Sequence, residues 1–342
     1  MVSIAVGMGA LAVLTSLIFG HSLVDPDGFI GPSYLRLPTI LALAFLLDLL
    51  PRTLWGARFN PRRMPDVFRA RVRSHWTRPR MELVVIGLLS FYVTYVSYRN
   101  LKSQLPFVEC KGHKFDTELN IIDKALFFGH SPGDVLHSAL GTGASAEVLS
   151  TVYLWFLPLV PLALTAWLVW SRNMSYGYWF ATSQCIAWTL GTISYYALPT
   201  LGPGFQHPWL YQTVENTNAG RLMNSLANSR VWAVNTSAPS LQPLTSTLSG
   251  VAGFASLHVA ITLLVALMIQ YTTTLRWLKI VFWVNTCITA VATLYFGWHY
   301  VADDIAGVAI ALFSFYVGGW ASGQSFTRYR AVERQLEEVT TV

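Results

Sequence analysis

The sequence predicts an all-α integral membrane protein, on the evidence of its composition, its apolar runs and its distribution of arginine. Of its 342 residues, 53% are hydrophobic and only 12% are charged, whereas a soluble domain carries about 25% charged residues. A helix that crosses a bilayer needs roughly 20 mostly apolar residues. Eight candidate runs lie near residues 2–20, 37–50, 82–98, 147–170, 177–198, 256–271, 277–296 and 300–320. We therefore predict a six-helix membrane core with about two additional N-terminal membrane helices.

The first two runs are interpreted from their flanks. The run 2–20 lacks a basic n-region, and no A-x-A-like site follows in "IFGHSLVDPDG", so we predict a membrane anchor rather than a signal peptide. The run 37–50 is short and ends at "LLDLLP"; it could be tilted, be re-entrant or begin earlier. We predict an N-terminal part of membrane helices and a basic cytoplasmic loop (1–80), a six-helix membrane domain (81–322) and a cytoplasmic tail (323–342).

Arginine predicts the orientation of these helices. Nine of the 18 arginines lie between residues 51 and 80, opposed only by Asp66. A basic block between two apolar runs is typical of a cytoplasmic loop that faces anionic headgroups, and we do not expect nucleic-acid binding. Arg172, Arg276 and the tail then also lie inside. We expect a multi-pass plasma-membrane protein whose outer segments are 99–146, 199–255 and 296–299.

The long outer segment 199–255 is rich in Pro, Gly, Ser, Thr and Asn. These residues favour turns, and a connection of this length without structure of its own is uncommon in a folded domain. We predict that it folds as a loop with short helices over the outer face.

The stretch "YFGWHYVADDIAG" places ionisable residues between two apolar runs. His299 and Asp303 are four residues apart, a spacing that puts both on one face of a helix. A carboxylate there can fix the imidazole tautomer and stabilise a positively charged ring. Ionisable residues at membrane depth are costly and usually functional, although a structural pair is the alternative. Asp304 is one position out of register, so we interpret it as secondary.

A second histidine motif, "GFASLHVA", opens the run 256–271. His258 follows Ser256 by two residues at the outer start of this helix. Free amide groups at a helix N-terminus, with a serine near the cap, can bind an anion. The arginine distribution puts His258 and His299 at the same membrane face, so the two motifs together suggest phosphate chemistry.

In combination, these motifs resemble the type 2 phosphatidic acid phosphatase superfamily. The segment "SLHVA" is followed about forty residues later by "GWHYVADDIAG". The resemblance extends over residues 83–320 and is closest to the branch that contains the fungal inositol phosphorylceramide synthases. The segments "YYALPTLGPGF" and "DKALFFGHSP" are similar to further parts of that branch.

The resemblance implies a mechanism and a substrate class. His299 would attack phosphorus and form a phosphohistidine, Asp303 would orient His299, and His258 would act as general acid and base. Ser256 would hold phosphoryl oxygens. No metal or other cofactor is implied. The substrate would be a phospholipid or a polyprenyl phosphate, and the acceptor an alcohol or water.

The sequence departs from the superfamily pattern at the phosphate-binding positions. Ala255 stands in place of a proline, Thr293 in place of an arginine, and Tyr195 in place of a lysine. Gly202, which we count as substrate-binding, precedes Pro203 where an arginine is usual.

A charged phosphate still needs counter-charge, so the cations must come from elsewhere. Arg99 and Lys102, at the outer end of the third run, are candidates, although their alternative role is interfacial snorkelling. Arg221 and Arg230 in the long outer segment are further candidates, unless they only face solvent.

Several functions remain open at the level of sequence. The missing cations favour transfer of a phosphoryl or phospho-headgroup, such as inositol phosphate, to an alcohol, but water can serve as acceptor in the same machinery. A lipid or polyprenyl phosphate phosphatase is therefore the first alternative. A transporter with the same residues in a substrate or proton site is the second. A haem protein with His258 and His299 as axial ligands is the third.

Overall fold

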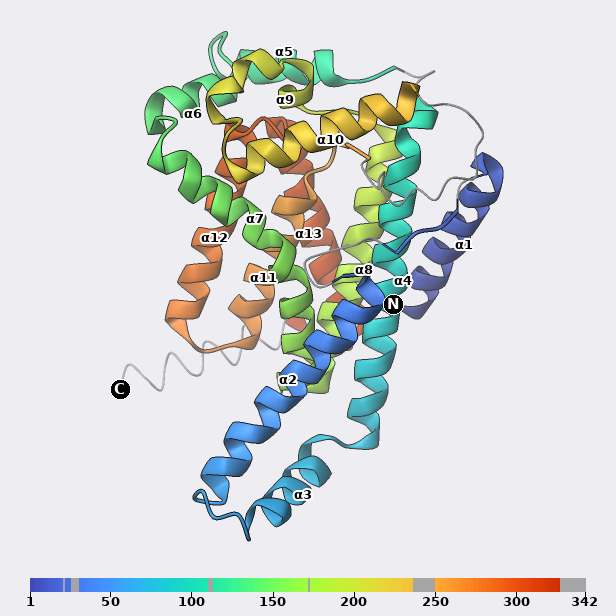
Figure 1. Ribbon diagram of the computed structural model, residues 1–342, viewed down its shortest axis with the longest axis vertical. Helices are drawn as coiled ribbons and strands as arrows, with labels where there is room; N and C mark the ends of the chain where they lie inside the picture. The colour runs from blue at the N-terminus through green and yellow to red at the C-terminus, as the bar shows by residue number, and fades with distance from the viewer. Residues whose placement is uncertain (21, 26–30, 110–112, 172, 236–249, 327–342) are drawn as a thin grey trace.

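Helices form nearly all of the regular structure, and the described residues contain no strands. The computed structural model describes residues 1–20, 22–25, 31–109, 113–171, 173–235 and 250–326. Figure 1 shows a bundle of long helices with shorter helices across one end and a protruding pair at the other. The α-helices are α1 Val2–Phe19, α2 Ser33–Gly56, α3 Met64–His75, α4 Arg78–Glu109, α5 Asp116–Leu126, α6 Pro132–Leu140, α7 Ala144–Thr165, α8 Met174–Ala197, α9 Pro203–Gln206, α10 Asn218–Asn235, α11 Leu257–Thr272, α12 Arg276–Tyr295 and α13 Val301–Ala321.

Within the described part of the chain, six helices are long and apolar enough to cross a membrane: α1, α2, α4, α7 with the π-helical turn that extends it to Trp170, α12 and α13. This confirms the prediction of an all-α membrane protein. Two more helices complete the bundle. Helix α11 has only 16 residues. Helix α8 is not among the six, and neighbouring helices bury 14 of its 24 residues.

Two predicted runs are longer in the structure. Helix α2 extends from Ser33 to Gly56 instead of 37–50, and α4 extends from Arg78 to Glu109 instead of 82–98. In α4 some of the polar residues that ended the predicted run are enclosed by protein. Asn100, for example, is buried and donates to the carbonyl oxygen of Val24 at 2.8 Å. Polar groups inside a bundle are tolerated when other protein groups satisfy them.

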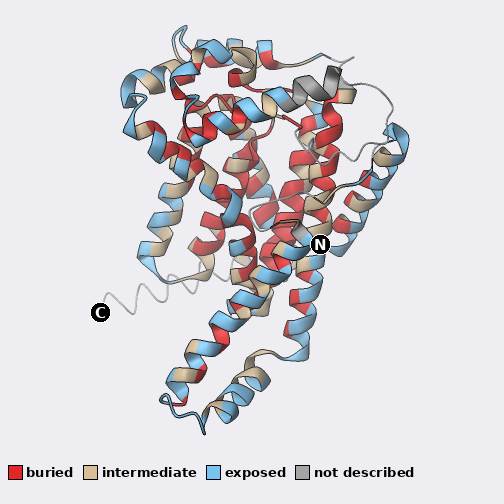
Figure 2. Ribbon diagram, in the orientation of Figure 1, coloured by how far each residue is buried: buried red, intermediate tan, exposed pale blue. Residues whose placement is uncertain are grey.

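Helix α8 lies at the centre of the packing. It contacts α4, α13 and α1, while α11 packs against α12 and α13. Figure 2 shows buried residues concentrated on α4, α8, α11 and α13. Gly318 of α13 directly contacts Ser183 of α8, so the lack of a side chain there allows close approach of the two helices.

Helices α5, α6, α9 and α10 cover one end of the bundle, which we call the cap (Figure 1). They correspond to the predicted outer segments 99–146 and 199–255. The predicted short helices in 199–255 are present, for example α9 with four residues, but α10 is longer than expected, with 18 residues. It is anchored on α7, where the amide of Ala219 donates to Ser150 Oγ at 2.9 Å. Residues 236–249 lie outside the described part of the chain.

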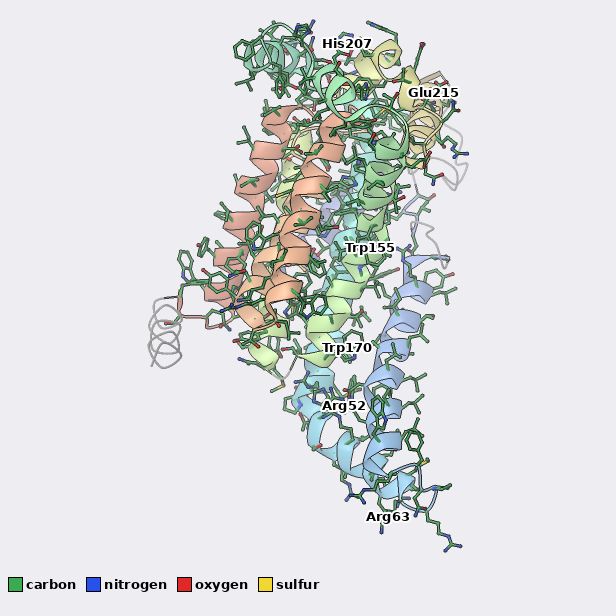
Figure 3. The ribbon with its side chains drawn as sticks, turned by 90° about the vertical axis from the view of Figure 1, so that its left-hand side faces the viewer. Arg52, Arg63, Trp155, Trp170, His207 and Glu215 are labelled. Atoms are coloured by element: carbon green, nitrogen blue, oxygen red, sulfur yellow. The ribbon has the colours of Figure 1, made fainter. Side chains whose placement is uncertain are left out.

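Helices α2 and α3 project from the opposite end as an arm. Figure 3 shows Arg52 and Arg63 beyond Trp170, at the end remote from His207 and Glu215 of the cap. The predicted basic loop is therefore partly helical. Asp48, buried in α2, binds Arg71 of α3 at 2.7 Å and Arg52 at 3.2 Å. Arg172 and most of the predicted tail, residues 327–342, lie outside the described residues.

Candidate functional site

The two histidine motifs meet at the cap end of the bundle. The hydroxyl oxygen of Ser256 caps α11 by accepting from the amide of Val259 at 3.4 Å. The amide of Ser256 donates to the carbonyl oxygen of Asp303 at 2.9 Å. These bonds tie the start of α11 to the first turn of α13. They also occupy the Ser256 amide, so a phosphoryl oxygen could contact only the Ser256 hydroxyl, which lies within hydrogen-bonding reach of Asp304.

His299 directly precedes Tyr300, the N-cap of α13, and it is only 4% exposed. Its Nδ1 lies 3.4 Å from Asp303 Oδ2. The same oxygen accepts from the amide of Tyr300 at 2.9 Å, in a capping box that fixes the carboxylate. The predicted pair thus exists, with Asp303 on the Nδ1 side. Nε2 of His299 is therefore the nitrogen suited to react.

His258 faces His299 across the site, with ring centroids 6.1 Å apart. One phosphoryl group between them could contact both rings. The ring of His258 stacks on Tyr153 at 4.3 Å and lies 4.2 Å from Phe156. Trp298 stacks on the same tyrosine at 5.4 Å. These aromatic residues form a wall that holds the His258 ring and limits access of water.

Asp304 was interpreted as secondary, but the structure buries it within the site. Its Oδ2 accepts from the hydroxyl of Thr293 at 2.8 Å, and Ser256 also lies within hydrogen-bonding reach. Thr293 is the residue that replaces the arginine of the superfamily pattern. A carboxylate therefore lies close to the position where a cation was expected. The sequence signal for this contact was the second of two adjacent aspartates, Asp304, which follows Thr293 by eleven residues.

Lys102 is the predicted cation that the structure brings nearest to the histidines. Its Nζ lies 5.4 Å from the ring centroid of Tyr195 and 5.9 Å from that of Tyr98. Its charge acts on His258. Tyr195 is the residue that replaces the lysine of the superfamily pattern, so a lysine from α4 lies over the position where α8 lacks one.

The other predicted cations are less closely associated with the histidines. Arg99 is half-buried, one turn from Lys102 on α4. Arg221 is exposed on α10 of the cap. The side chain of Arg230 lies outside the part that the structure describes.

Gly202 allows two segments of the site to approach one another. Its φ of 99° favours glycine, and a Cβ there would lie 2.5 Å from the carbonyl oxygen of Trp298. Its amide donates to Asp116 Oδ1 at 2.9 Å. The structure therefore gives Gly202 a role in packing against the His299 motif, while its substrate-binding role remains a prediction.

Two buried aspartates of α5 were not predicted as site residues. Asp116 and Asp123 are 4% and 1% exposed, and they accept hydrogen bonds from the backbone on both sides of the site. Burial and the nearby Asp303 and Asp304 raise the pKa of Asp123 to about 7, although the bond from Val301 lowers it. The sequence signal was the segment "DKALFFGHSP", which begins at Asp123.

Comparison with protein families decides the membership of the chain. Residues 117–317 match the family model of the PAP2 superfamily, which is more than half of the 342 residues. The chain belongs to the PAP2 superfamily. Members of PAP2 are generally phosphatases and phosphotransferases that act on lipid phosphates. The match includes both histidine motifs, Asp123 of α5 and the two aspartates of α13, whereas Asp116 lies directly before it.

No curated protein matches the PAP2 chain, and no solved structure matches it. The superfamily part of the predicted resemblance is thus confirmed, whereas the inositol phosphorylceramide synthase branch is not.

Proposed function

We propose that this PAP2 protein is a metal-independent lipid phosphotransferase that forms a phosphohistidine on His299. The observation that supports it most directly is the buried His299, backed by Asp303 at 3.4 Å and facing His258 at 6.1 Å between ring centroids. A nucleophile, a group that orients it and a proton donor opposite it are the requirements of covalent catalysis.

In the first half-reaction, Nε2 of His299 attacks phosphorus and the bond from phosphorus to the leaving oxygen breaks. Protonated His258 gives its proton to that oxygen and becomes neutral. Asp303 stabilises the positive charge on the His299 ring. In the second half-reaction, neutral His258 takes the proton of an alcohol or water, whose oxygen attacks phosphorus. The phosphorus–nitrogen bond then breaks, and both histidines return to their initial states.

Charge on the phosphoryl oxygens is balanced in this scheme by Lys102, with the hydroxyl of Ser256 as a further donor. Charge-assisted hydrogen bonds of this kind are about twice as strong as neutral ones. Arg99, on the same helix, adds positive potential near Lys102.

The balance of charge supports transfer from a phosphodiester lipid. Thr293 and Tyr195 replace two cations of the superfamily pattern, and Asp304 adds a buried carboxylate to the site. A monoanionic phosphodiester, such as a phosphatidylinositol-like donor, is repelled less by Asp304 than a dianionic monoester is. Lipid or polyprenyl phosphate hydrolysis is the alternative activity, with water in place of the acceptor alcohol.

We also propose that the cap faces the extracytoplasmic side of the plasma membrane. Seven of the nine arginines between residues 51 and 80 are exposed, and the arm that bears most of them lies opposite the cap (Figure 3). The positive-inside rule then assigns the arm to the cytoplasm and the two histidines to the outer face.

Lipid turnover by the purified protein in detergent with EDTA tests the proposed function. The donors are a phosphatidylinositol-type lipid and a polyprenyl phosphate, each with and without inositol or a lipid alcohol. We expect activity in EDTA, acceptor-dependent product, and losses of at least about 100-fold in His299→Ala and His258→Ala. His130→Ala, an exposed cap histidine, is the matched control.

Other outcomes would change the assignment. Release of free phosphate whatever the acceptor would make the protein a phosphatase. Equal turnover by the wild type and both site variants would show that the two histidines do not perform the chemistry.

A further inference from the structure

Helix α5 of the cap presents two buried carboxylates to the His299 motif. Asp116 and Asp123 are seven residues apart, close to two turns of an α-helix, so both lie on the same face. They are 4% and 1% exposed, whereas Glu118 on the same helix is exposed. A buried carboxylate is costly unless hydrogen bonds satisfy it, so the partners of this pair indicate what it does.

Asp116 connects the turn before α9 to the residue after His299. Its carboxylate accepts from the amides of Leu201 at 3.0 Å and Gly202 at 2.9 Å. The same side chain accepts from the hydroxyl of Tyr300 at 3.2 Å. This turn packs against Gly297 and Trp298. The amide of Gly204, in α9 directly after the turn, donates to the carbonyl oxygen of Gly297 at 2.8 Å.

Asp123 holds the first residue of α13. Its Oδ1 accepts from the amide of Val301 at 3.1 Å, one of the amides that have no partner inside their own helix. The preceding amide, that of Tyr300, is bound by Asp303. The backbone is therefore fixed at two successive amides directly after His299, one by its orienting carboxylate and one by α5.

We propose that Asp116 and Asp123 are positioning residues for His299 and that α5 is the strap that holds the backbone on both sides of it. This inference rests on the proposed function, in which His299 is the nucleophile. The angle of attack of Nε2 depends on the backbone between Gly297 and Val301, since no helix contains His299 itself. A misplacement of about 1 Å can cost about 100-fold in rate.

Enzyme kinetics and hydrogen exchange test the strap in the full-length protein. The variants are Asp116→Ala, Asp116→Asn, Asp123→Ala and Asp123→Asn, with Glu118→Gln as the control on the exposed face of α5. We expect Asp123→Ala to lower kcat about 10- to 100-fold while KM stays within about threefold, because the lipid contacts remain. The Asn variants keep an acceptor oxygen for the backbone amide, so we expect them to lose less kcat than the Ala variants. Glu118→Gln should match the wild type.

Amide exchange provides a readout that does not depend on turnover. We expect faster exchange of peptides covering 297–303 in Asp123→Ala, and covering 199–204 in Asp116→Ala, in monodisperse protein. The proposal would be overturned if these peptides exchanged at the wild-type rate in the variants, or if the variants changed KM alone. If the wild type turns over no lipid, the proposed function fails, and exchange alone then decides whether α5 holds these segments.

Discussion

At the scale of single residues, polar and charged side chains from other helices lie beside the positions where the sequence departs from the superfamily pattern. Tyr195 stands where the superfamily has a lysine, and Lys102 of α4 lies over its ring. Thr293 stands where the superfamily has an arginine, and it donates instead to Asp304 at 2.8 Å. The departures from the pattern therefore change the charge of the site without removing its polarity. They make Lys102 the residue on which binding of an anionic substrate should depend most.

Replacing Lys102 with methionine should weaken substrate binding. A hydrogen bond to a charged group contributes about 1.5–3 kcal/mol, so we expect KM for an anionic lipid to rise about 10- to 100-fold. The comparison is Lys124→Met, which removes an exposed lysine of α5. Steady-state kinetics measures both. Equal KM values for the two variants would contradict a phosphate-binding role for Lys102.

Asp123 should make the stability of the protein depend on pH. Its pKa is about 7 in the folded protein, against 3.8 ordinarily. Between these values the folded state keeps a proton that the unfolded state releases, so the free energy of unfolding falls as pH rises, by about 1.4 kcal/mol per unit. The groups facing Asp123 are Asp303 and Asp304 of α13, with Tyr211 of the cap.

Thermal unfolding of detergent-purified protein between pH 5 and 8 measures this dependence. We expect Asp123→Asn to have a flatter profile than the wild type, with its advantage greatest at pH 8. Parallel profiles for the two proteins would show that Asp123 does not titrate in this range.

At the scale of elements, the arm shows how a basic segment is folded at the end of a bundle. Its α2–α3 pair is joined through Asp48, which is 3% exposed and bound to Arg71. Nε2 of His75, at the end of α3, lies 3.0 Å from the carbonyl oxygen of Val169 in the π-helical turn. Arg80 of α4 donates to the same oxygen. The contact of His75 attaches the arm to the bundle, while all arginines between residues 52 and 73 other than Arg71 stay exposed.

Removal of Asp48 should loosen the arm. Asp48→Ala leaves Arg71, whose side chain is 23% exposed, without its carboxylate, and loss of a buried partner is strongly destabilising. We expect trypsin to cleave within residues 58–73 at least about tenfold faster. Asp66→Ala removes an exposed ion pair with Arg69, in which the charged atoms are 4.0 Å apart. Because exposed pairs contribute little stability, cleavage of this variant should stay near the wild-type rate. Unchanged cleavage in Asp48→Ala would show that the pair does not hold the arm.

At the scale of the whole molecule, charge and chemistry lie at opposite ends. The cap covers the histidine motifs, and the arm carries most of the exposed arginines of the segment 51–80 (Figures 1 and 3). Exposed tryptophans such as Trp155 and Trp170 lie along α7 between the two ends. An arrangement with one basic end favours one orientation in a membrane.

Labelling of intact cells checks this orientation. Glu215→Cys in the cap and Arg63→Cys in the arm are placed in a background without the three native cysteines. A membrane-impermeant maleimide should modify Glu215→Cys in intact cells and Arg63→Cys only after the cells are opened. The reverse pattern would place the histidines at the cytoplasmic face.

The sequence by itself determined the class of the protein, most of its spans and the core of its candidate site. Hydropathy along a run and the four-residue spacing of His299 and Asp303 are local properties, so they can be recognised without knowledge of the fold. The sequence did not determine the length of α4, the 18-residue helix of the cap or the burial of Asp304.

Only the tertiary structure decided which distant residues complete the site. Lys102 meets Tyr195 from another helix, and Asp116 reaches Tyr300 across 184 residues of sequence. Such contacts depend on how helices pack, because a buried charge is stable only where the fold supplies its partners. The local pattern specified the proposed reacting groups, and the packing of α4 and α5 specified what surrounds them.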